Sequence, residues 1–280
     1  MLKIGARGSN LSRIQAETVG SLMQKYGYDV EYRWISSFGD MDQKSPLSSF
    51  GEGIFVNTIN EELLRGGIDI AVHSGKDIPG TYSNDLEVAY VSQRGDPRDT
   101  LVSSSSIHET PKGGKVGTSS SRRRMQLQDL RQDLVFSEIR GNIETRISKI
   151  GSEFHGVVLA KVALDRLKIR IENYPFSYQE MVPAPNQGFI VAMCRRGESP
   201  DLTAIDRESR EVFNMERFCM NYLGFGCSQP LGIIVERRGR GFMLSIRHYK
   251  ENGIRDIDDK IGFSDQDDLL SILSNYKEII

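Results

Sequence analysis

The strongest constraint on the fold is an alternation of short apolar segments with helical patterns, which occurs in two stretches of the chain. In the first stretch, caps, apolar spacing and glycine stops predict a strand at 2–6, a helix from Ser9 or Asn10 to Gly27, a strand at 30–34, a helix over 55–63 and a strand at 68–72. A β-α-β-α-β run of this kind predicts one α/β unit.

The second stretch repeats the alternation. It predicts a strand at 115–119, a helix from Arg122, a strand at 134–139, a helix from Asn142, a strand at 157–160 and a helix through Leu167. From about Thr203 the pattern changes to a long helix through Tyr222, a strand at 231–236, a hairpin around Gly239 and Gly241 and a helix from Asp265. Two α/β units are therefore expected, followed by a smaller α+β domain that begins near residue 207.

Composition narrows the class of protein. With 280 residues and 38% hydrophobic content, the chain is long enough for about two domains. The N-terminus carries no leader pattern and no apolar run approaches ~18 residues, so we expect a cytoplasmic protein without a membrane partner. Cys194, Cys219 and Cys227 are too few and too irregularly spaced for a disulfide framework, and the four scattered histidines predict no metal site.

Cys227 lies in a tight glycine turn, Leu223–Pro230. Most lone cysteines are small buried apolar residues, whereas a turn of this kind presents a thiol outward. The position favours a cysteine that carries a group, with a structural thiol as the alternative.

A basic stretch predicts a site for an anion. Residues 115–149 hold eight Lys/Arg against four Asp/Glu. Within it, Gly114–Arg124 reads as a strand, a hydroxyl-rich turn and a helix start, where free N–H groups and arginines converge. A second strand end follows at Arg140–Asn142, with Arg146 on the next helix. Successive helix positions point about 100° apart, so Arg124 is expected at the surface.

Nucleic acid is not the expected anion. The net charge of the chain is -2, and no aromatic residues are interleaved with the arginines.

Two further strand ends carry polar residues. Lys76 and Asp77 follow the strand at 68–72, and Arg7 and Ser9 follow the first strand. Open α/β sheets bind ligands at such ends, so these residues are expected to face one cleft between two lobes. Lys76 and Asp77 also fit a surface ion pair, and a non-catalytic two-lobed binder of an anionic small molecule would show the same pattern.

The order of motifs resembles the porphobilinogen deaminases, also called hydroxymethylbilane synthases. The motifs that carry the resemblance are Ile4–Ser9, Gly51–Phe55, Asp69–Ser74 with Lys76 and Asp77, Gly95–Asp99, Val116–Ser120 with Arg122 and Arg123, Arg140–Asn142, Pro183–Ala184 with Gln187 and Gly188, and the turn around Cys227. Each motif is weak alone, but eight in the same order make chance similarity improbable.

The resemblance implies a fold and its division. It implies an α/β protein with two periplasmic-binding-protein-like lobes and a small C-terminal α+β domain. The implied divisions are 1–94 with 186–206 for the first lobe, 95–185 for the second, and 207–280 for the domain bearing the cysteine.

The resemblance also implies an activity, that of a monomeric transferase of porphyrin (heme) biosynthesis. Cys227 would hold a dipyrromethane cofactor through a thioether, and porphobilinogen units would be added until the linear tetrapyrrole hydroxymethylbilane is released. Asp77 would be catalytic, protonating the departing amine and stabilising positive charge as the azafulvene-like cation forms.

The remaining implied roles concern carboxylates. Lys76, Ser120, Arg122, Arg123 and Arg140 would bind the cofactor. Arg7, Ser9, Gln15, Arg146 and Arg166 would serve the incoming pyrrole.

The chain departs from the family pattern at several positions. Glu52 replaces a usual Lys, Gly75 a common Met and Phe225 a usual Gly, while Ser228–Gln229 and Pro185–Asn186 alter two motifs. The altered loops leave an inactive paralogue of the deaminase as a third hypothesis.

Overall fold

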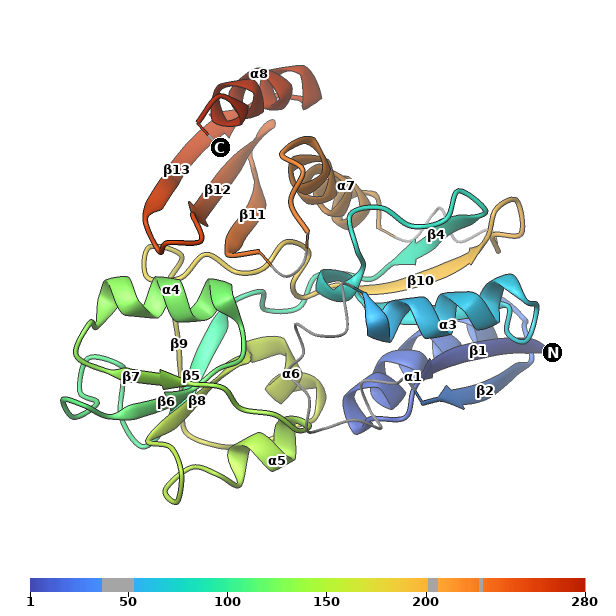
Figure 1. Cartoon of the computed structure of the whole chain (residues 1–280). Coiled ribbons are helices and arrows are strands. Elements are labelled where there is room, and N and C mark those ends of the chain that lie inside the picture. The colour runs from blue at the N-terminus through green and yellow to red at the C-terminus, as the bar shows by residue number, and fades with distance from the viewer. Residues whose placement is uncertain (37–52, 201–205, 227–228, 280) are drawn as a thin grey trace. The chain divides into compact units, whose positions relative to one another are not determined.

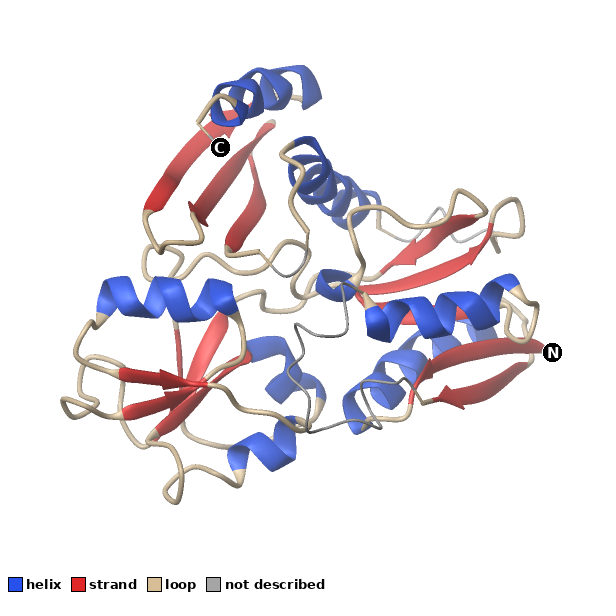
Figure 2. Ribbon diagram, viewed as in Figure 1, coloured by secondary structure: helices blue, strands red, loops and turns tan. Residues whose placement is uncertain are grey.

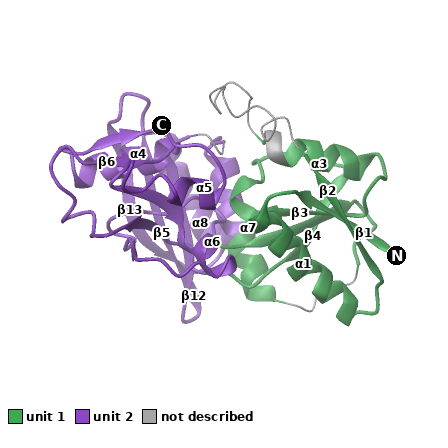
Figure 3. Cartoon of the chain, turned by 90° about the horizontal axis from the view of Figure 1, so that it is seen from below, with its two compact units in different colours: residues 1–95, 188–214 green, residues 96–187, 215–280 purple. Residues whose placement is uncertain are grey.

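The computed structural model (Figure 1) describes residues 1–36, 53–200, 206–226 and 229–279, without the side chains of Ile54 and Phe55. Glu52, Cys227 and Ser228 lie outside the described residues. The chain forms two compact units, residues 1–95 with 188–214 and residues 96–187 with 215–280 (Figure 3). We refer to them as unit 1 and unit 2. The division into three domains stays a prediction.

Unit 1 is built on a five-stranded sheet of order β2-β1-β3-β10-β4. Its elements are β1 (Leu2–Arg7), α1 (Asn10–Lys25), β2 (Val30–Ile35), α3 (Ile54–Leu64), β3 (Ile70–Ser74), the 3-10 turn η2 (Gly75–Asp77), β4 (Leu86–Val91), β10 (Ile190–Arg195) and the first part of α7 (Arg207–Tyr222). Helices α1 and α3 both contact β1 and β3 (Figure 2).

The ends of α1 follow from its sequence. Ser9 is the N-cap and accepts a hydrogen bond from the amide of Ser12, and Gly27 adopts the left-handed conformation just after the helix, with φ +85°. The apolar face of α1 packs on the face of the sheet formed by Ile4, Ala6, Ile70 and Val72. These contacts fix the direction in which the end of β1 points.

Unit 2 contains a second five-stranded sheet, of order β7-β6-β8-β5-β9. Its elements are β5 (Asp99–Ser103), β6 (Lys115–Gly117), α4 (Ser121–Leu130), β7 (Val135–Ser137), α5 (Ile143–Ile147), β8 (Gly156–Ala160), α6 (Lys161–Arg166) and β9 (Asn173–Pro175). Leu127 of α4 packs on one face of the sheet with Val116 and Val158, and Leu164 of α6 packs with Val157 and Leu159 on the other.

The two sheets share one topology. In each, the first strand of the βαβ run lies between the second and third in parallel, and the fourth position holds an antiparallel strand, β10 in unit 1 and β5 in unit 2. The expected pair of α/β lobes is therefore confirmed, although the sequence itself contains no repeat.

The C-terminal part of unit 2 is a small antiparallel sheet with helices. It consists of β11 (Leu231–Arg238), β12 (Gly241–Tyr249), β13 (Arg255–Phe263) and α8 (Gln266–Lys277), and it follows the end of α7. Asp265 caps α8 by accepting from the amides of Asp267 and Asp268. The small C-terminal α+β part of the fold class is confirmed.

Several boundaries differ from the sequence-based expectation. The strand expected at 68–72 spans Ile70–Ser74, because Ile4 and Gly5 of β1 pair with Ile70 and Ala71. The strands expected at 115–119 and 134–139 are each shorter, Lys115–Gly117 and Val135–Ser137. No local pattern predicted β4, β5 or β10, since these strands are largely buried on both faces and lack a period-two signal.

None of the described helices combines the length and the hydropathy needed to cross a bilayer.

Candidate functional site

In unit 1, the predicted polar residues gather where β1 and β3 end side by side. Arg7 is the last residue of β1, and Ser9 begins α1. Because β1 and β3 are parallel neighbours, their carboxyl ends lie at the same edge of the sheet. Arg7 and Ser9 therefore lie at the same edge of the sheet as the segment after β3, while their joint position in a cleft stays a prediction.

Gln15 connects α1 to the end of β3. Its side chain is buried, its Nε2 donates to Ser74 Oγ at 2.8 Å, and the Ser74 hydroxyl lies 3.3 Å from Gln15 Oε1. Gln15 thus holds the residue that precedes η2. A direct role towards a substrate pyrrole stays a prediction.

Lys76 and Asp77 lie in η2, immediately after β3. The amide of Gly75 donates to Phe189 O and the amide of Ile78 donates to Gly75 O, which ties the turn to the start of β10. Lys76 is half-buried and the Asp77 side chain is exposed. The structure therefore presents Asp77 to solvent at the edge where β1 and β3 end.

His73 is the buried residue behind this turn. Its Nε2 lies 2.9 Å from Asn60 Oδ1, so the network assigns a neutral ring that donates to the amide oxygen. Burial lowers the pKa of His73 from 6.5 to about 3.

The buried histidine predicts a pH dependence of stability. Since the folded pKa lies below the unfolded one, its contribution is complete above pH 6.5 and is lost progressively as the pH falls to about 3. At ~1.4 kcal/mol per unit, the full loss is about 4–5 kcal/mol. In urea titrations between pH 7 and 4, the free energy of unfolding should fall less steeply for His73→Gln than for the wild type. Equal slopes would contradict the assignment.

In unit 2, Ser119 brings two predicted strand ends together. The Ser119 hydroxyl donates to Ile139 O at 2.6 Å and accepts from the amide of Ile139 at 3.0 Å. The loop after β6 and the loop after β7 are joined at this point. Ser120 and Arg140, the residues that follow each partner, therefore belong to one cluster.

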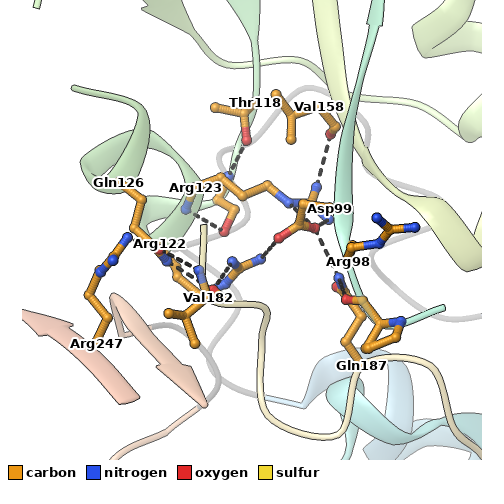
Figure 4. Close-up of polar contacts among 12 residues, drawn as sticks. Arg98, Asp99, Thr118, Arg122, Arg123, Gln126, Val158, Val182, Gln187 and Arg247 are labelled. Atoms are coloured by element: carbon orange, nitrogen blue, oxygen red, sulfur yellow. Dashed lines mark hydrogen bonds and ion pairs between the residues drawn. The ribbon is translucent and has the colours of Figure 1, made fainter. Parts of the chain in front are cut away.

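Helix α4 begins at this cluster. Ser120 is its N-cap and accepts from the amide of Arg123 at 3.4 Å. Arg122 and Arg123 are only 4% and 7% exposed, whereas Arg124 is exposed as expected. Both buried arginines turn towards the sheet (Figure 4).

Asp99 at the start of β5 is the counter-charge of the two buried arginines (Figure 4). Arg123 Nε donates to Asp99 Oδ1 at 2.9 Å. Arg122 Nη2 lies 2.8 Å from Oδ2, an ion pair outside hydrogen-bond geometry. Gln187 Nε2 also donates to Oδ1, at 3.0 Å. Two guanidinium groups share one carboxylate, so the cluster keeps one positive charge.

The titration of Asp99 reflects these contacts. Burial alone raises the pKa of its carboxyl, but the charges of Arg122 and Arg123 and the hydrogen bond from Gln187 outweigh burial and hold the pKa at about 2. Each arginine also donates a hydrogen bond to a carbonyl oxygen. Arg122 Nη1 donates to Val182 O at 2.7 Å, and Arg123 Nη1 donates to Val158 O at 2.9 Å. The first turn of α4 is thus held rigidly.

Arg140 is different. Its Nη1 is buried and has no hydrogen-bond partner among the described residues. A buried guanidinium nitrogen without an acceptor is costly, and a carboxylate is the acceptor that best fits its geometry. This nitrogen fits a group that carries carboxylates.

Arg146 and Arg166 lie on the short helices of unit 2. Arg146 Nε donates to Gly141 O at 2.9 Å, which fixes its side chain against the loop of Arg140. Arg166 is the last residue of α6, and burial lowers the pKa of its guanidinium to about 10. A desolvated guanidinium interacts more strongly with an anion than a fully hydrated one.

Cys227 lies outside the described residues, but the residues before it are described. Gly224 adopts φ +73° and the amide of Phe225 donates to Met220 O, which ends α7 in a Schellman motif. Phe225 is buried and stacks on His248, with ring centroids 4.3 Å apart. The Phe225 side chain is thus part of the packing just before the cysteine.

Sequence reasoning assigned no role to Asp99 or Gln187, although both fall in quoted motifs. The available signal was an acid within the apolar segment Asp99–Val102, which is buried in the sheet. A carboxylate in that position requires a cationic partner, and the chain offers adjacent arginines.

With this geometry in hand, comparison with known proteins identifies the family. Residues 2–202 match the family model described as "Porphobilinogen deaminase, dipyromethane cofactor binding domain". The chain belongs to the porphobilinogen deaminase family. The matched domain binds dipyrromethane, and the matched residues include Asp77 and Asp99 but end before Cys227.

Relatives of this family resemble the chain over most of its length. A protein of Thermoplasma acidophilum named "Probable porphobilinogen deaminase" is 41% identical over 90% of this chain and 87% of its own. One of the same name from Thermoplasma volcanium is 39% identical over 100% of this chain and 96% of its own. Among solved structures, a periplasmic substrate-binding protein of an ABC transporter from Coxiella burnetii is 14% identical, with a TM-score of 0.44, over 72% of this chain and 88% of that one.

Proposed function

We propose that this chain is a hydroxymethylbilane synthase that condenses porphobilinogen head to tail, with loss of ammonia, on a dipyrromethane bound to Cys227 through a thioether. The observation that carries the proposal is Arg140 Nη1, which is buried and has no hydrogen-bond partner among the described residues. Arg140 follows Ile139, whose backbone is bonded to Ser119 just before the N-cap of α4. When bound, dipyrromethane supplies the primer to which substrate units are added.

The residues of unit 2 suit the carboxylates of the cofactor. Arg140 offers a donor in an already desolvated position. Arg122 and Arg123 supply the net positive charge that remains after Asp99 is counted, and Ser120 caps the helix that carries them. Because their side chains are held by Asp99, Val182 and Val158, we expect them to act mainly through charge. Lys76 of unit 1 completes the proposed set.

Asp77 suits the chemical step. Its carboxyl can deliver a proton to the departing amine of porphobilinogen, and the resulting carboxylate stabilises the positive charge that develops on the pyrrole nitrogen. A short turn tied at both ends by backbone hydrogen bonds holds this side chain in place. The catalytic assignment rests on this placement and on the family match.

The incoming pyrrole carries acetate and propionate groups. We assign their binding to Arg7, Ser9, Gln15, Arg146 and Arg166. Gln15 contributes by holding Ser74, whereas Arg146 and Arg166 contribute cationic groups on unit 2. We further propose that the protein works in the cytoplasm as a monomer, without membrane or nucleic acid partners.

Incubation of the purified protein with porphobilinogen tests the proposal. We expect ammonia release with formation of hydroxymethylbilane, which closes with loss of water to uroporphyrinogen I on standing. Oxidation of that product with added oxidant gives uroporphyrin I, whose absorbance is measured. A protein that binds porphobilinogen reversibly and returns it unchanged would be a binder. A protein that carries the cofactor without turnover would be the inactive paralogue. Family membership favours the deaminase over the binder.

A further inference from the structure

We propose that β12 is a positioning strand: Arg247 holds the C-terminal sheet against α4, and His248 holds Phe225 at the root of the segment that carries Cys227. This inference rests on the proposed function only for its link to cofactor attachment. It makes Arg247, His248 and Phe225 positioning residues, since none of them need contact the substrate.

Arg247 joins the C-terminal sheet to the second lobe. Its Nη1 donates to Gln126 Oε1 at 3.2 Å and to Glu180 O at 3.1 Å, and its Nη2 donates to Gln179 O at 3.0 Å. Its Nε donates to Asp258 Oδ1 at 2.7 Å, so the buried charge is compensated. Because Nε, Nη1 and Nη2 of one planar guanidinium all donate hydrogen bonds, these contacts fix both the position and the orientation of the Arg247 side chain.

Gln126 carries this contact on to the arginine cluster (Figure 4). Fully buried on α4, it accepts from the amide of Val182 at 2.7 Å and donates to Val182 O at 3.0 Å. Arg122 Nη1 donates to the same carbonyl oxygen. Arg247 and Arg122 are therefore connected through one side chain and one peptide unit.

A second contact of β12 reaches the same helix. The hydroxyl of Tyr249 donates to Asp129 Oδ2 at 2.7 Å, and Asp129 lies three residues after Gln126 on α4. Residues three apart share one face of a helix. Arg247 and Tyr249 together attach β12 to one face of α4.

His248, between these two residues, makes a different contact. Its ring stacks on Phe225, and its Nδ1 lies 2.8 Å from Asp256 Oδ1 of β13. Both side chains of the His248–Asp256 pair are nearly inaccessible, at 7% and 5% exposed. The ring that supports Phe225 is thus held from behind by a buried carboxylate. Phe225 precedes Cys227 by two residues in the sequence.

These contacts connect Phe225, through β12 and Gln126, to Arg122 of α4. Phe225 supplies the ring that stacks on His248, a contact that glycine or alanine at this position would not make. The stack restricts the chain at Phe225, two residues before Cys227. This restriction lowers the conformational entropy that is lost when Cys227 is brought to its reaction partner.

Three variants test the inference. Arg247→Lys keeps the charge but loses the fork, Phe225→Ala loses the stack, and His248→Phe keeps a ring but loses the bond to Asp256. Arg238→Lys is the matched control, because Arg238 belongs to the same sheet, pairs with Glu236 at 3.4 Å and is 62% exposed.

Two readouts are measured on apoprotein. In hydrogen exchange, we follow the backbone amide of residue 225, corrected for the intrinsic exchange rate of the residue present. We expect it to exchange at least ~10-fold faster in Arg247→Lys and Phe225→Ala than in the wild type or the control. After addition of porphobilinogen, intact mass should show cofactor acquisition slowed by a similar factor. His248→Phe, which keeps the stack, is expected to fall between the wild type and Phe225→Ala.

The first readout does not depend on the proposed function. Wild-type exchange rates in both Arg247→Lys and Phe225→Ala would overturn the inference. If Arg247→Lys does not fold, wild-type exchange in Phe225→Ala and His248→Phe has the same meaning. A wild type that gains no mass with porphobilinogen would instead contradict the proposed function, and the exchange result would still decide the inference.

Discussion

Replacing Asp77 with Asn is expected to reduce the turnover of porphobilinogen by about 100-fold to 10,000-fold, the range typical of a lost general acid. An amide cannot deliver the proton, and it offers no negative charge to the developing cation. The side chain is exposed, so the fold should be unaffected. The measurement is kcat for ammonia release by variant protein that mass spectrometry shows to be loaded with cofactor.

Asp29→Asn is the matched control for this experiment. Asp29 is an exposed aspartate of the same unit, but it precedes β2 at the opposite end of the strands. We expect its turnover and its thermal midpoint to equal those of the wild type. Wild-type turnover by cofactor-loaded Asp77→Asn would remove Asp77 from the mechanism.

Replacing Asp99 with Asn is expected to destabilise unit 2 by about 3–5 kcal/mol, because two buried guanidinium groups lose their only carboxylate partner within the described residues. The variant should also acquire the covalent cofactor more slowly, since Arg122 and Arg123 would no longer be held at the start of α4. Urea unfolding measured at pH 7 gives the first effect and intact mass the second.

The Asp99 carboxyl also predicts acid sensitivity. Its folded pKa of about 2 lies below the ordinary 3.8, so its contribution is present above pH 3.8 and disappears as the pH falls through about 2.

Asp96→Asn provides the contrast to Asp99→Asn. Asp96 pairs with Arg98 at 2.6 Å, but the two side chains are 25% and 41% exposed, and such pairs contribute about 1 kcal/mol or less. A loss of stability in Asp99→Asn no larger than in Asp96→Asn would contradict the account of the buried cluster.

Local sequence signals predicted the elements that bring the site residues to the strand ends. Ser9, Ser120 and Asn142 each cap a helix in the structure, and each follows a strand of a sheet. Two strands that were not predicted, β5 and β10, are each antiparallel to both of their neighbours and are largely buried on both faces. Their sequences do not alternate between apolar and polar residues, so only pairing with neighbouring strands defines them.

The candidate site was predictable in its charges and not in its contacts. The three adjacent arginines indicated an anion site, and helical geometry correctly assigned Arg124 to the surface. That Arg122 and Arg123 share Asp99 depends on residues 23 and 24 positions apart, and no local pattern shows that Arg140 keeps a buried nitrogen without a partner among the described residues. Pairings over that separation arise from the sheet order β7-β6-β8-β5, which no local pattern contains.

The central claim is that Cys227 carries a covalent dipyrromethane, and the intact mass of denatured protein tests it most directly. Wild-type protein and Cys227→Ser are each incubated with porphobilinogen, denatured and weighed by mass spectrometry. We predict an excess of one dipyrromethane on the wild type and none on the variant. If each protein has the mass of its own unmodified sequence, the claim is contradicted. The same mass excess on both proteins would show that the group is attached elsewhere.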